Sequence, residues 1–317
     1  MTRVTVLGAG VAGLCVAQEL ACRGAQVTVI DPAGAPGPGA CSWWAGGMLA
    51  PFCEGEVAEP EVVDLGRTAA AWWCAAGADV TDAGTLVLAL SRDRAELDRF
   101  ARRTQGHRWL DRAGIAGLEP ALAERFDRAL FFDTEAHLAP RATLTGLRDR
   151  LAARGVAFLT EGAPEGTVID CRGLAARDRL ADLRGVRGEM AVLRAPGLGL
   201  ARPVRLLHPR HPLYLVPRGD DVYMLGATQI EGDGRGPATL RAVVELLNAA
   251  YAIHPAFAEA EVLEIGADAR PAFPDNMPRV LRAGGRLHVN GLYRHGFLLA
   301  PALARQAADM VLTQEGT

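Results

Sequence analysis

Short apolar runs alternate with glycine-containing and polar segments from the first residues of the chain onward. Residues 3–7 (RVTVL) form a β-branched run, which predicts a buried strand. A helix is predicted over residues 11–23 and ends at Gly24, because glycine is the usual residue after a helix. A second β-branched run, residues 25–30, ends at Asp31. The pattern therefore predicts a strand–helix–strand unit at the start of the chain.

The middle of the chain mixes helical and strand patterns. The spacing of apolar residues predicts helices over residues 59–76, 91–104 with a serine N-cap, 143–154 and 240–252. Shorter apolar runs predict strands at residues 85–90, 157–159 and 167–170. Past Arg187 the pattern favours a mostly antiparallel sheet, with strands at 189–194, 203–207, 213–218 and 221–228. The chain ends in a strand–turn–helix pattern over residues 286–312.

These elements predict an α/β fold: a Rossmann-like dinucleotide-binding domain with an inserted, mostly antiparallel β-sheet domain. A chain of 317 residues is long for one core, so two domains are expected. The predicted nucleotide-binding domain is discontinuous and comprises residues 1–80, 135–186 and 265–317. The predicted substrate-binding domain comprises residues 81–134 and 187–264, and it should close over the carboxyl ends of the parallel strands, where ligands bind in such sheets.

The sequence GAGVAG, with Gly8, Gly10 and Gly13, lies between the first predicted strand and helix. The first glycine permits the tight turn, the second lets backbone approach a pyrophosphate, and the third lets the helix pack closely on the strand. Asp31 ends the second strand at the distance expected of an acceptor for ribose hydroxyls. An ordinary glycine-rich turn would not explain Asp31. The motif predicts a nucleotide cofactor but does not by itself separate FAD from NAD.

Composition excludes several classes of protein. Half of the residues are apolar and the formal net charge is −3, so no basic surplus indicates nucleic acid as a partner. No run of 18 uncharged apolar residues is present, and the first strand begins at residue 3, so neither a membrane span nor a signal peptide is expected. A cytoplasmic location follows as an expectation.

The cysteines and the missing lysines bear on the chemistry. The six cysteines show no CxxC pair and no metal-ligand spacing, so reduced thiols and no metal are expected. Cys15 and Cys22 lie seven apart on the first helix, and both are expected to face the core. All 34 basic residues are arginine. Schiff-base chemistry and the phosphate-binding P-loop both need a lysine, so both are excluded.

Several segments, in the same order along the chain, carry a family resemblance. These are GAGVAG with Asp31, SWWAGGMLAP, EAHLAPRATL, VIDCRG, VRGEM, YLVPR with YMLGAT, ARPAFPDNMP and GLYRHGFLLAP. Together they resemble the FAD-dependent amino acid oxidases of the D-amino acid oxidase and sarcosine oxidase type, and within that family the glycine oxidases. One departure is the short segment between residues 160 and 167, where the family carries an extra β-meander. Its absence should expose the adenosine side.

The resemblance implies where FAD binds. Ala45, Gly46, Gly47 and Met48 would wrap the flavin ring, and Asp170 and Gly173 would lie beside the adenosine half. The backbone N–H groups of the C-terminal helix, which begins soon after the turn at Gly296, would face the N1–C2=O edge of the flavin and favour its reduction. The alternatives are a tight loop without a ligand and a helix that only packs on the sheet. The complete predicted cofactor set is Gly8, Gly10, Val11, Ala12, Gly13, Asp31, Pro32, Ala45, Gly46, Gly47, Met48, Asp170, Gly173, Arg270, Arg294, His295, Gly296, Phe297 and Leu298.

The resemblance also implies the substrate residues. Arg270 matches the arginine that binds the substrate carboxylate, a role that suits its planar, bidentate guanidinium. Tyr214 matches the tyrosine that adds a hydroxyl donor to the same carboxylate. Arg294 falls among residues that line the site, and His295 is either a donor or a turn residue. Trp43, Trp44 and Met48 are expected to leave little room for a large substrate side chain.

The implied function is FAD-dependent oxidation of glycine or another small amino acid or amine. Hydride passes from the α-carbon to flavin N5, which gives an imine and, with oxygen as acceptor, hydrogen peroxide, with a role in thiamine (thiazole) biosynthesis. FAD is expected to be non-covalent, because Ala272 stands where flavinylated relatives carry cysteine. A homo-oligomer is possible. Since relatives use a lysine near the flavin for the oxygen step, an FAD-dependent dehydrogenase of D-amino acids or sarcosine-type amines, with a non-oxygen acceptor, is the alternative. A non-catalytic flavin-binding subunit is the alternative of another class.

Overall fold

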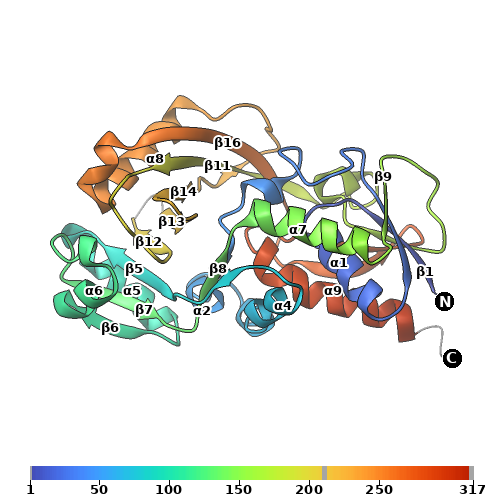
Figure 1. The fold of residues 1–317 in the computed structure, drawn as a ribbon, viewed down its shortest axis with the longest axis horizontal. Helices are drawn as coiled ribbons and strands as arrows, with labels where there is room; N and C mark the ends of the chain where they lie inside the picture. Colours follow the sequence, from blue (N-terminus) through green and yellow to red (C-terminus); the bar gives the residue numbers. More distant parts are fainter. Residues whose placement is uncertain (1, 209–212, 314–317) are drawn as a thin grey trace.

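The computed structural model describes residues 2–208 and 213–313, which fold around two large sheets and a small one (Figure 1). The first sheet is parallel apart from its β17–β18 hairpin. Its strands follow the order β17 (Arg279–Ala283), β18 (Arg286–Asn290), β10 (Thr167–Asp170), β1 (Arg3–Leu7), β2 (Gln26–Ile30) and β9 (Ala157–Leu159). Three separated parts of the chain therefore build one sheet.

Three helices pack beside the first sheet, at the right of Figure 1: α1 (Val11–Cys22), α7 (Pro140–Ala153) and α9 (Gly296–Leu312). Helix α1 contacts both of the others. Their apolar side chains share one core with β1, β2, β10 and β18. Burial of this apolar stripe stabilises the helices, since short helices are marginal by themselves. The predicted strand–helix–strand unit is confirmed to within two residues.

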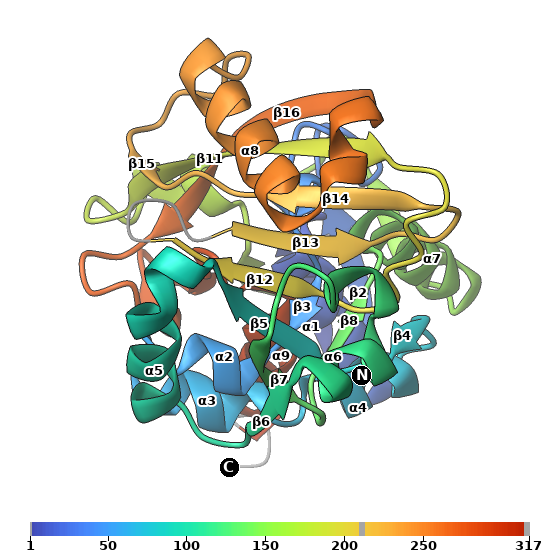
Figure 2. The same cartoon turned by 90° about the vertical axis from the view of Figure 1, so that its left-hand side faces the viewer.

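The second large sheet is mostly antiparallel, as predicted; β12 and β5 are its parallel pair. Its path is β15 (Ile230–Glu231), β11 (Arg184–Arg194), β14 (Val222–Gly226), β13 (Leu213–Pro217), β12 (Val204–Leu207), β5 (Thr85–Ala89), β7 (Arg128–Phe132) and β6 (Arg108–Asp111). Strand β16 (Glu261–Ala272) also pairs with β11. Figure 2 shows this sheet face-on, with α8 (Leu240–Ile253) near β11 and β16.

A small sheet and several short helices complete the structure. The small sheet has the order β3 (Met48–Leu49), β8 (Ala136–Leu138) and β4 (Val80–Thr81). The other α-helices are α2 (Pro51–Glu54), α3 (Pro60–Gly66), α4 (Ala69–Ala75), α5 (Arg94–Arg103) and α6 (Arg112–Leu118). The 3-10 helices are η1 (Cys41–Trp44), η2 (Ser91–Asp93), η3 (Pro120–Leu122), η4 (Gly173–Asp178) and η5 (Pro255–Glu259).

The long antiparallel pair β11–β16 connects the two predicted domains. The predicted boundary between residues 186 and 187 falls within β11, and the one between residues 264 and 265 falls within β16. Both strands run without interruption from the edge of the nucleotide-binding part into the second sheet. The domain limits stay a prediction. Any division of the chain into these two domains would have to pass through β11 and β16.

Two helix predictions were wrong in detail. The predicted helix over 59–76 is divided into α3 and α4. Its break follows Gly66, which has low helix propensity and packs so closely on α9 that a Cβ atom there would lie 2.9 Å from Leu298. The predicted serine cap is also absent. Ser91 begins the 3-10 helix η2 and makes no capping hydrogen bond, and α5 starts only at Arg94.

Cys15 is buried as predicted, but Cys22 is exposed. Seven residues of helix place both on nearly the same face. Cys22, however, is the last residue of α1, and its sulfur accepts hydrogen bonds from Gln18 and Arg154 rather than packing in the core. The helical spacing of the two cysteines was predicted correctly. Cys22 is nevertheless exposed, because it is the last residue of the helix.

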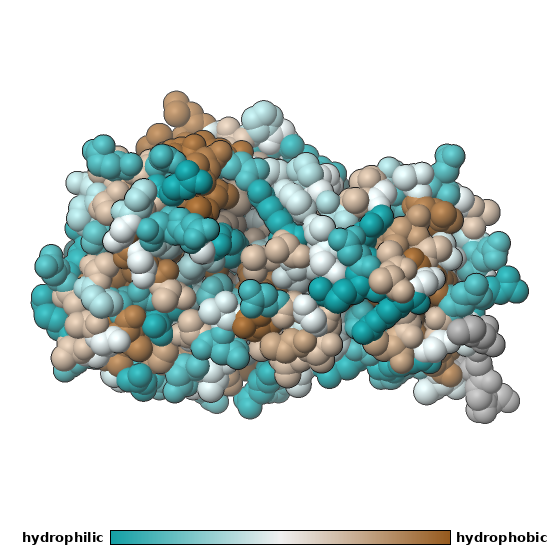
Figure 3. Space-filling view, viewed as in Figure 1, coloured by the Kyte–Doolittle hydropathy of each residue, from teal (hydrophilic) through white to brown (hydrophobic). Residues whose placement is uncertain are grey.

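Apolar residues gather over α8 and β16, at the upper left of Figure 3. The exposed large apolar side chains of these two elements are Leu240, Val244, Tyr251, Val262, Leu263 and Ile265. Within the described part of the chain, no helix has the length and apolar character that a bilayer crossing requires. The described residues also contain no group of three histidine, cysteine, aspartate or glutamate side chains that could hold a metal ion.

Candidate active site

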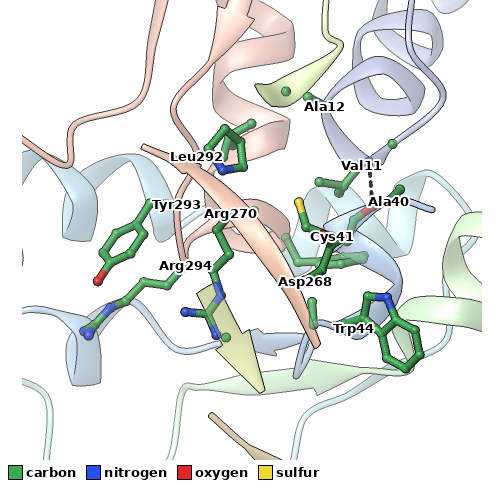
Figure 4. Close-up of a pocket in the computed structure, with 18 of the residues that line it drawn as sticks. Val11, Ala12, Ala40, Cys41, Trp44, Asp268, Arg270, Leu292, Tyr293 and Arg294 are labelled. Carbon is green, nitrogen blue, oxygen red and sulfur yellow. Dashed lines mark hydrogen bonds between the residues drawn. The ribbon is translucent and has the colours of Figure 1, made fainter. Parts of the chain in front are cut away.

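A cavity of about 590 Å³ lies between the first sheet and the second. It is lined by the turn after β1, the segment from Gly39 to Met48, strands β11, β13 and β16, and the start of α9. Figure 4 shows Arg270 inside it, with Cys41 and Trp44 on one side and Tyr293 and Arg294 on the other. A cavity at the carboxyl ends of parallel strands is where an α/β sheet binds its ligand.

The glycine motif forms one end of the cavity. Gly8 has a φ of +97°, and a Cβ atom there would lie 2.8 Å from the Cys171 carbonyl oxygen. Gly13 does not line the cavity; a Cβ atom there would lie 1.9 Å from the Gly8 carbonyl oxygen, so it permits the close helix–strand packing that was predicted. The other predicted residues of this region, Gly10, Val11, Ala12 and Pro32, line the cavity.

Asp31 lines the same end of the cavity and is held by the backbone. Its two carboxylate oxygens accept from the N–H groups of Ala9 (2.7 Å) and Ala33 (2.8 Å). Each oxygen still has lone pairs, so the carboxylate can also accept from ribose hydroxyls. The geometry fits the predicted role at the end of β2.

The structure does not bring Asp170 to the cavity. Its side chain is fully buried and pairs with Arg172 at 2.7 Å, behind the cavity wall. Arg172 and Gly173 line the cavity in its place. The sequence pattern located the correct turn, but the buried carboxylate holds Arg172 instead of facing a ligand.

The segment from Ala45 to Met48 forms a wall of mostly backbone, as predicted. A Cβ atom at Gly46 would lie 2.6 Å from Tyr214 Cε2, and one at Gly47 would lie 2.2 Å from the Leu138 carbonyl oxygen. Both positions therefore require glycine. A flat backbone wall suits a planar aromatic ligand such as a flavin ring, because no side chain holds the ring away.

The start of α9 forms another part of the wall, with Gly296, Phe297 and Leu298 at the cavity surface. The first N–H groups of a helix have no acceptor within the helix, and they carry partial positive charge. Trp73 donates from Nε1 to the Phe297 carbonyl at 2.8 Å, which anchors this turn. These N–H groups can serve an anionic edge of a ligand, as predicted.

Arg270 differs from the other arginines of the cavity. Arg172, Arg205, Arg235 and Arg294 each pair with a carboxylate. Among the described residues, the Arg270 guanidinium donates hydrogen bonds only to the Thr228 carbonyl, at 3.4 Å, and no carboxylate pairs with it. A Cβ atom at Gly188 would lie 1.9 Å from Arg270 Nη2, so glycine makes room for the guanidinium on the neighbouring strand. Arg270 is thus free to bind an external carboxylate.

Tyr214 lies on β13 and lines the cavity, as predicted. Two glycines pack closely on its ring: a Cβ atom at Gly226 would lie 2.9 Å from the Tyr214 hydroxyl oxygen, and Gly46 approaches the ring as described above. The ring is therefore in close contact with backbone at two positions.

Arg294 belongs to a largely buried ion cluster that the sequence did not predict. Its Nε donates to Glu54 Oε2 at 2.7 Å, and Arg205 Nη2 donates to Glu54 Oε1 at 2.7 Å. Burial alone would raise the pKa of Glu54, but Arg294 and Arg205 hold that pKa well below its ordinary value. The Arg294 side chain is therefore committed to Glu54. The sequence contains one indication of this cluster, because Arg205 is the charged residue within the otherwise apolar run 203–207.

His295 lies at the N-cap of α9, where it is buried and lines the cavity. Burial lowers its pKa to about 4, against the opposing pull of Glu54, whose Oε2 is 3.5 Å from Nδ1. The ring is neutral at pH 7. It can donate or accept a hydrogen bond but cannot supply a positive charge there.

Three side chains were predicted to limit the size of the substrate, and two of them line the cavity. Trp44 and Met48 line the cavity. Trp43 is not part of the lining and packs instead against Arg141, whose guanidinium carbon is 5.1 Å from the ring centre. Cys41, and Asp268 with its partner Arg235, are among the lining groups that were not predicted.

The chain belongs to the FAD-dependent oxidoreductase family: the family profile DAO, "FAD dependent oxidoreductase", matches residues 3–310. The chain is 56% identical to a thiamine biosynthesis oxidoreductase ThiO of Rhizobium etli, over 99% of this chain and 98% of that protein. It is 29% identical to a glycine oxidase of Pseudomonas aeruginosa, over 99% of this chain and 95% of that one.

Solved structures agree on the fold. The structure of glycine oxidase from Bacillus cereus superposes with a TM-score of 0.83 at 21% identity and covers 99% of this chain and 96% of its own. That of an iminodiacetate oxidase from Chelativorans superposes with a TM-score of 0.81 at 25% identity, over 98% and 95%. The predicted fold class, family and cofactor are thereby confirmed. The glycine turn, the backbone wall at residues 45–48 and the unpaired N–H groups of α9 fit FAD.

Proposed function

We propose that the protein oxidises glycine or another small amino acid or amine to an imine, and that it serves thiamine biosynthesis. One observation carries the proposal: Arg270 is the cavity arginine that pairs with no carboxylate of the described residues. A carboxylate-bearing substrate would complete that pair. The relatives named ThiO and glycine oxidase support the substrate class and the pathway.

The chain's own residues would bind and orient the substrate. Arg270 would hold the carboxylate by two parallel hydrogen bonds, and the Tyr214 hydroxyl would donate to the same group. Trp44 and Met48 would limit the substrate side chain. When bound, FAD supplies the acceptor for the hydride of the substrate α-carbon. The protein contributes position and electrostatics, and the N–H groups at the start of α9 favour negative charge on the ligand they face.

The electron acceptor is proposed to be oxygen, with peroxide as product. The chain has no lysine, so positive charge near the site comes from arginine. The cluster contains two arginines, Arg205 and Arg294, and one carboxylate, Glu54, so its net charge is positive by one. The missing lysine is also the observation that favours the second candidate, a dehydrogenase that passes electrons to a quinone or carrier protein.

Anaerobic mixing tests both the substrate and the acceptor. The purified FAD-bound protein is mixed with glycine, sarcosine or D-alanine while the flavin absorbance is followed, and air is then admitted. Bleaching by glycine with fast recovery in air supports the oxidase. Bleaching that recovers slowly in air but rapidly with a quinone supports the dehydrogenase. No bleaching by any of the three would contradict the proposed substrate class.

A further inference from the structure

Arg218, directly after β13, makes an unusual set of contacts. Its Nη2 donates to the carbonyl oxygens of Gly46 at 2.7 Å and Ala45 at 3.4 Å. Its Nη1 donates to the carbonyl oxygens of Leu138 at 3.4 Å and Pro217 at 3.3 Å. All of these partners are backbone, and no carboxylate of the described residues pairs with the guanidinium. Arg218 thus connects the wall at Ala45 and Gly46 to strands β8 and β13.

The charge of Arg218 is costly where it lies. Burial lowers its pKa to about 10, and the neighbouring Arg141 acts in the same direction. The side chain nonetheless stays protonated at neutral pH. A partly buried cation without a carboxylate loses hydration that neutral carbonyls only partly replace. An apolar residue would fill this space at lower cost, so stability alone is a poor explanation for an arginine here.

The contact between Gly46 and Tyr214 connects Arg218 to the site. The Gly46 backbone lies so close to the Tyr214 ring that even a methyl group would clash, at 2.6 Å from Cε2. Gly226, on the neighbouring strand, also packs closely on the ring, near its Cε2 and Cζ atoms. A shift of the Gly46 backbone toward the ring would therefore displace it. The carbonyl group that Arg218 holds at 2.7 Å belongs to this same residue.

We propose that Arg218 is a positioning residue, which fixes the backbone wall at Ala45 and Gly46 against the Tyr214 ring and so aims the Tyr214 hydroxyl at the substrate carboxylate. This inference rests on the proposed function, in which Tyr214 and Arg270 bind that carboxylate. Arg218 lines no part of the cavity itself, so any effect on a ligand passes through residues that do, namely Ala45 and Gly46, which it holds, and Tyr214, which Gly46 contacts. In this proposal its effect on the substrate carboxylate passes through Tyr214, which a double-mutant cycle tests.

A double-mutant cycle on the FAD-bound enzyme tests whether Arg218 acts on the ligand through Tyr214. The probe is acetate, which is glycine without its amine, and its Kd is measured from the change in flavin absorbance. Tyr214→Phe should raise this Kd about tenfold, because the hydrogen bond of a donor to a charged acceptor is lost. Arg218→Met should raise it about fivefold. The variant with both changes should bind acetate within about twofold of Tyr214→Phe alone, because Arg218 acts through the lost hydroxyl.

Conservative and control variants separate positioning from folding. Arg218→Lys keeps a charged donor for the Gly46 carbonyl and should restore acetate binding to within about threefold of the wild type. If Arg218→Met fails to fold, Arg218→Gln replaces it in the same double-mutant cycle, because glutamine also lacks the positive charge. Arg194→Met, which removes an exposed arginine of β11 paired with Glu261, should leave the Kd unchanged. For glycine, Arg218→Met should raise KM more than it lowers kcat.

Two results would overturn different parts of the account. If the losses from Arg218→Met and Tyr214→Phe multiply in the double variant, Arg218 does not act through Tyr214 and the inference is wrong. If Arg270→Ala leaves acetate binding unchanged, the carboxylate site itself is misplaced, and the proposed function fails with it. Weakened binding in Arg270→Ala together with multiplying losses contradicts only the role of Arg218.

Discussion

The two ends of the cavity are built in different ways. At the nucleotide end, the turn after β1 consists of backbone and glycine, and its shape follows mainly from residues within one strand–helix–strand unit, with Cys171 packed against Gly8. At the substrate end, the important groups are charged side chains from distant parts of the chain, such as Glu54, Arg205 and Arg294. Local steric rules fix the first end, whereas long-range charge pairing fixes the second. Substitutions should therefore have different effects on the protein at the two ends.

The largest effect is expected at Gly13. Gly13→Ala would place a Cβ atom 1.9 Å from the Gly8 carbonyl oxygen, so α1 must move away from β1. Overpacking of this kind costs about 3 kcal/mol or more and displaces the N–H groups that face the cofactor. The purified variant should lack the yellow colour of FAD. Gly117→Ala is the matched control, since a Cβ atom there meets nothing within 4 Å. A Gly13→Ala protein with normal FAD content would contradict the steric account of this end.

The next effect is expected at Glu54. Glu54→Gln removes the carboxylate that Arg205 and Arg294 share, and breaking a buried ion pair costs about 3 kcal/mol. Urea unfolding of the FAD-bound protein measures the loss. Glu165→Gln, at an exposed pair with Arg3, should change stability by less than about 0.5 kcal/mol. Equal small effects of both substitutions would show that the cluster does not fix the substrate end.

The effect of Glu54 should also depend on pH. The pKa of Glu54 is lowered in the folded protein from an ordinary value of 4.5. Its contribution to stability is therefore complete above pH 4.5 and declines as the pH falls below that value, because the unfolded chain then takes up a proton first. The difference in unfolding free energy between wild type and Glu54→Gln should shrink below pH 4.5. A difference that grows there would contradict the ion cluster.

The smallest of these effects is expected at His137. Burial, and secondarily the charge of Arg218, lowers the pKa of His137 to about 4 from 6.5. As the pH falls from 7 to 5, the unfolded chain binds a proton that the folded protein excludes, so this histidine should cost about 1–2 kcal/mol of stability. His137→Gln should lose less stability than the wild type over this range in urea unfolding. Glu135, whose pKa burial raises to about 7, acts in the opposite direction equally in both proteins. Identical slopes would contradict the prediction.

The contrast between the two ends also explains what the sequence could predict. The strand–helix–strand unit and the role of Gly13 follow from local patterns, and the structure confirms them. Arg270 and Tyr214 were predicted only through the family resemblance, because no local rule distinguishes one arginine among 34 basic residues. Glu54 was missed, since its pair with Arg205 joins residues more than a hundred positions apart, and the one sign of that pair was the charge of Arg205 within an apolar run. Arg218 was missed because its partners are backbone carbonyls, which no side-chain pattern reveals. Asp170 was expected at the ligand because its turn is correct, but its direction depends on Arg172.

The most direct test of the central claim compares anaerobic flavin bleaching by glycine in the wild type and Arg270→Ala, at equal FAD content. A charge-assisted bidentate pair is worth several kcal/mol, so the second-order rate of bleaching should fall by about a hundredfold or more. Arg270→Lys should recover part of this loss, because a point charge replaces the planar pair. Bleaching of Arg270→Ala at the wild-type rate would contradict the account, since Arg270 would then hold no substrate carboxylate.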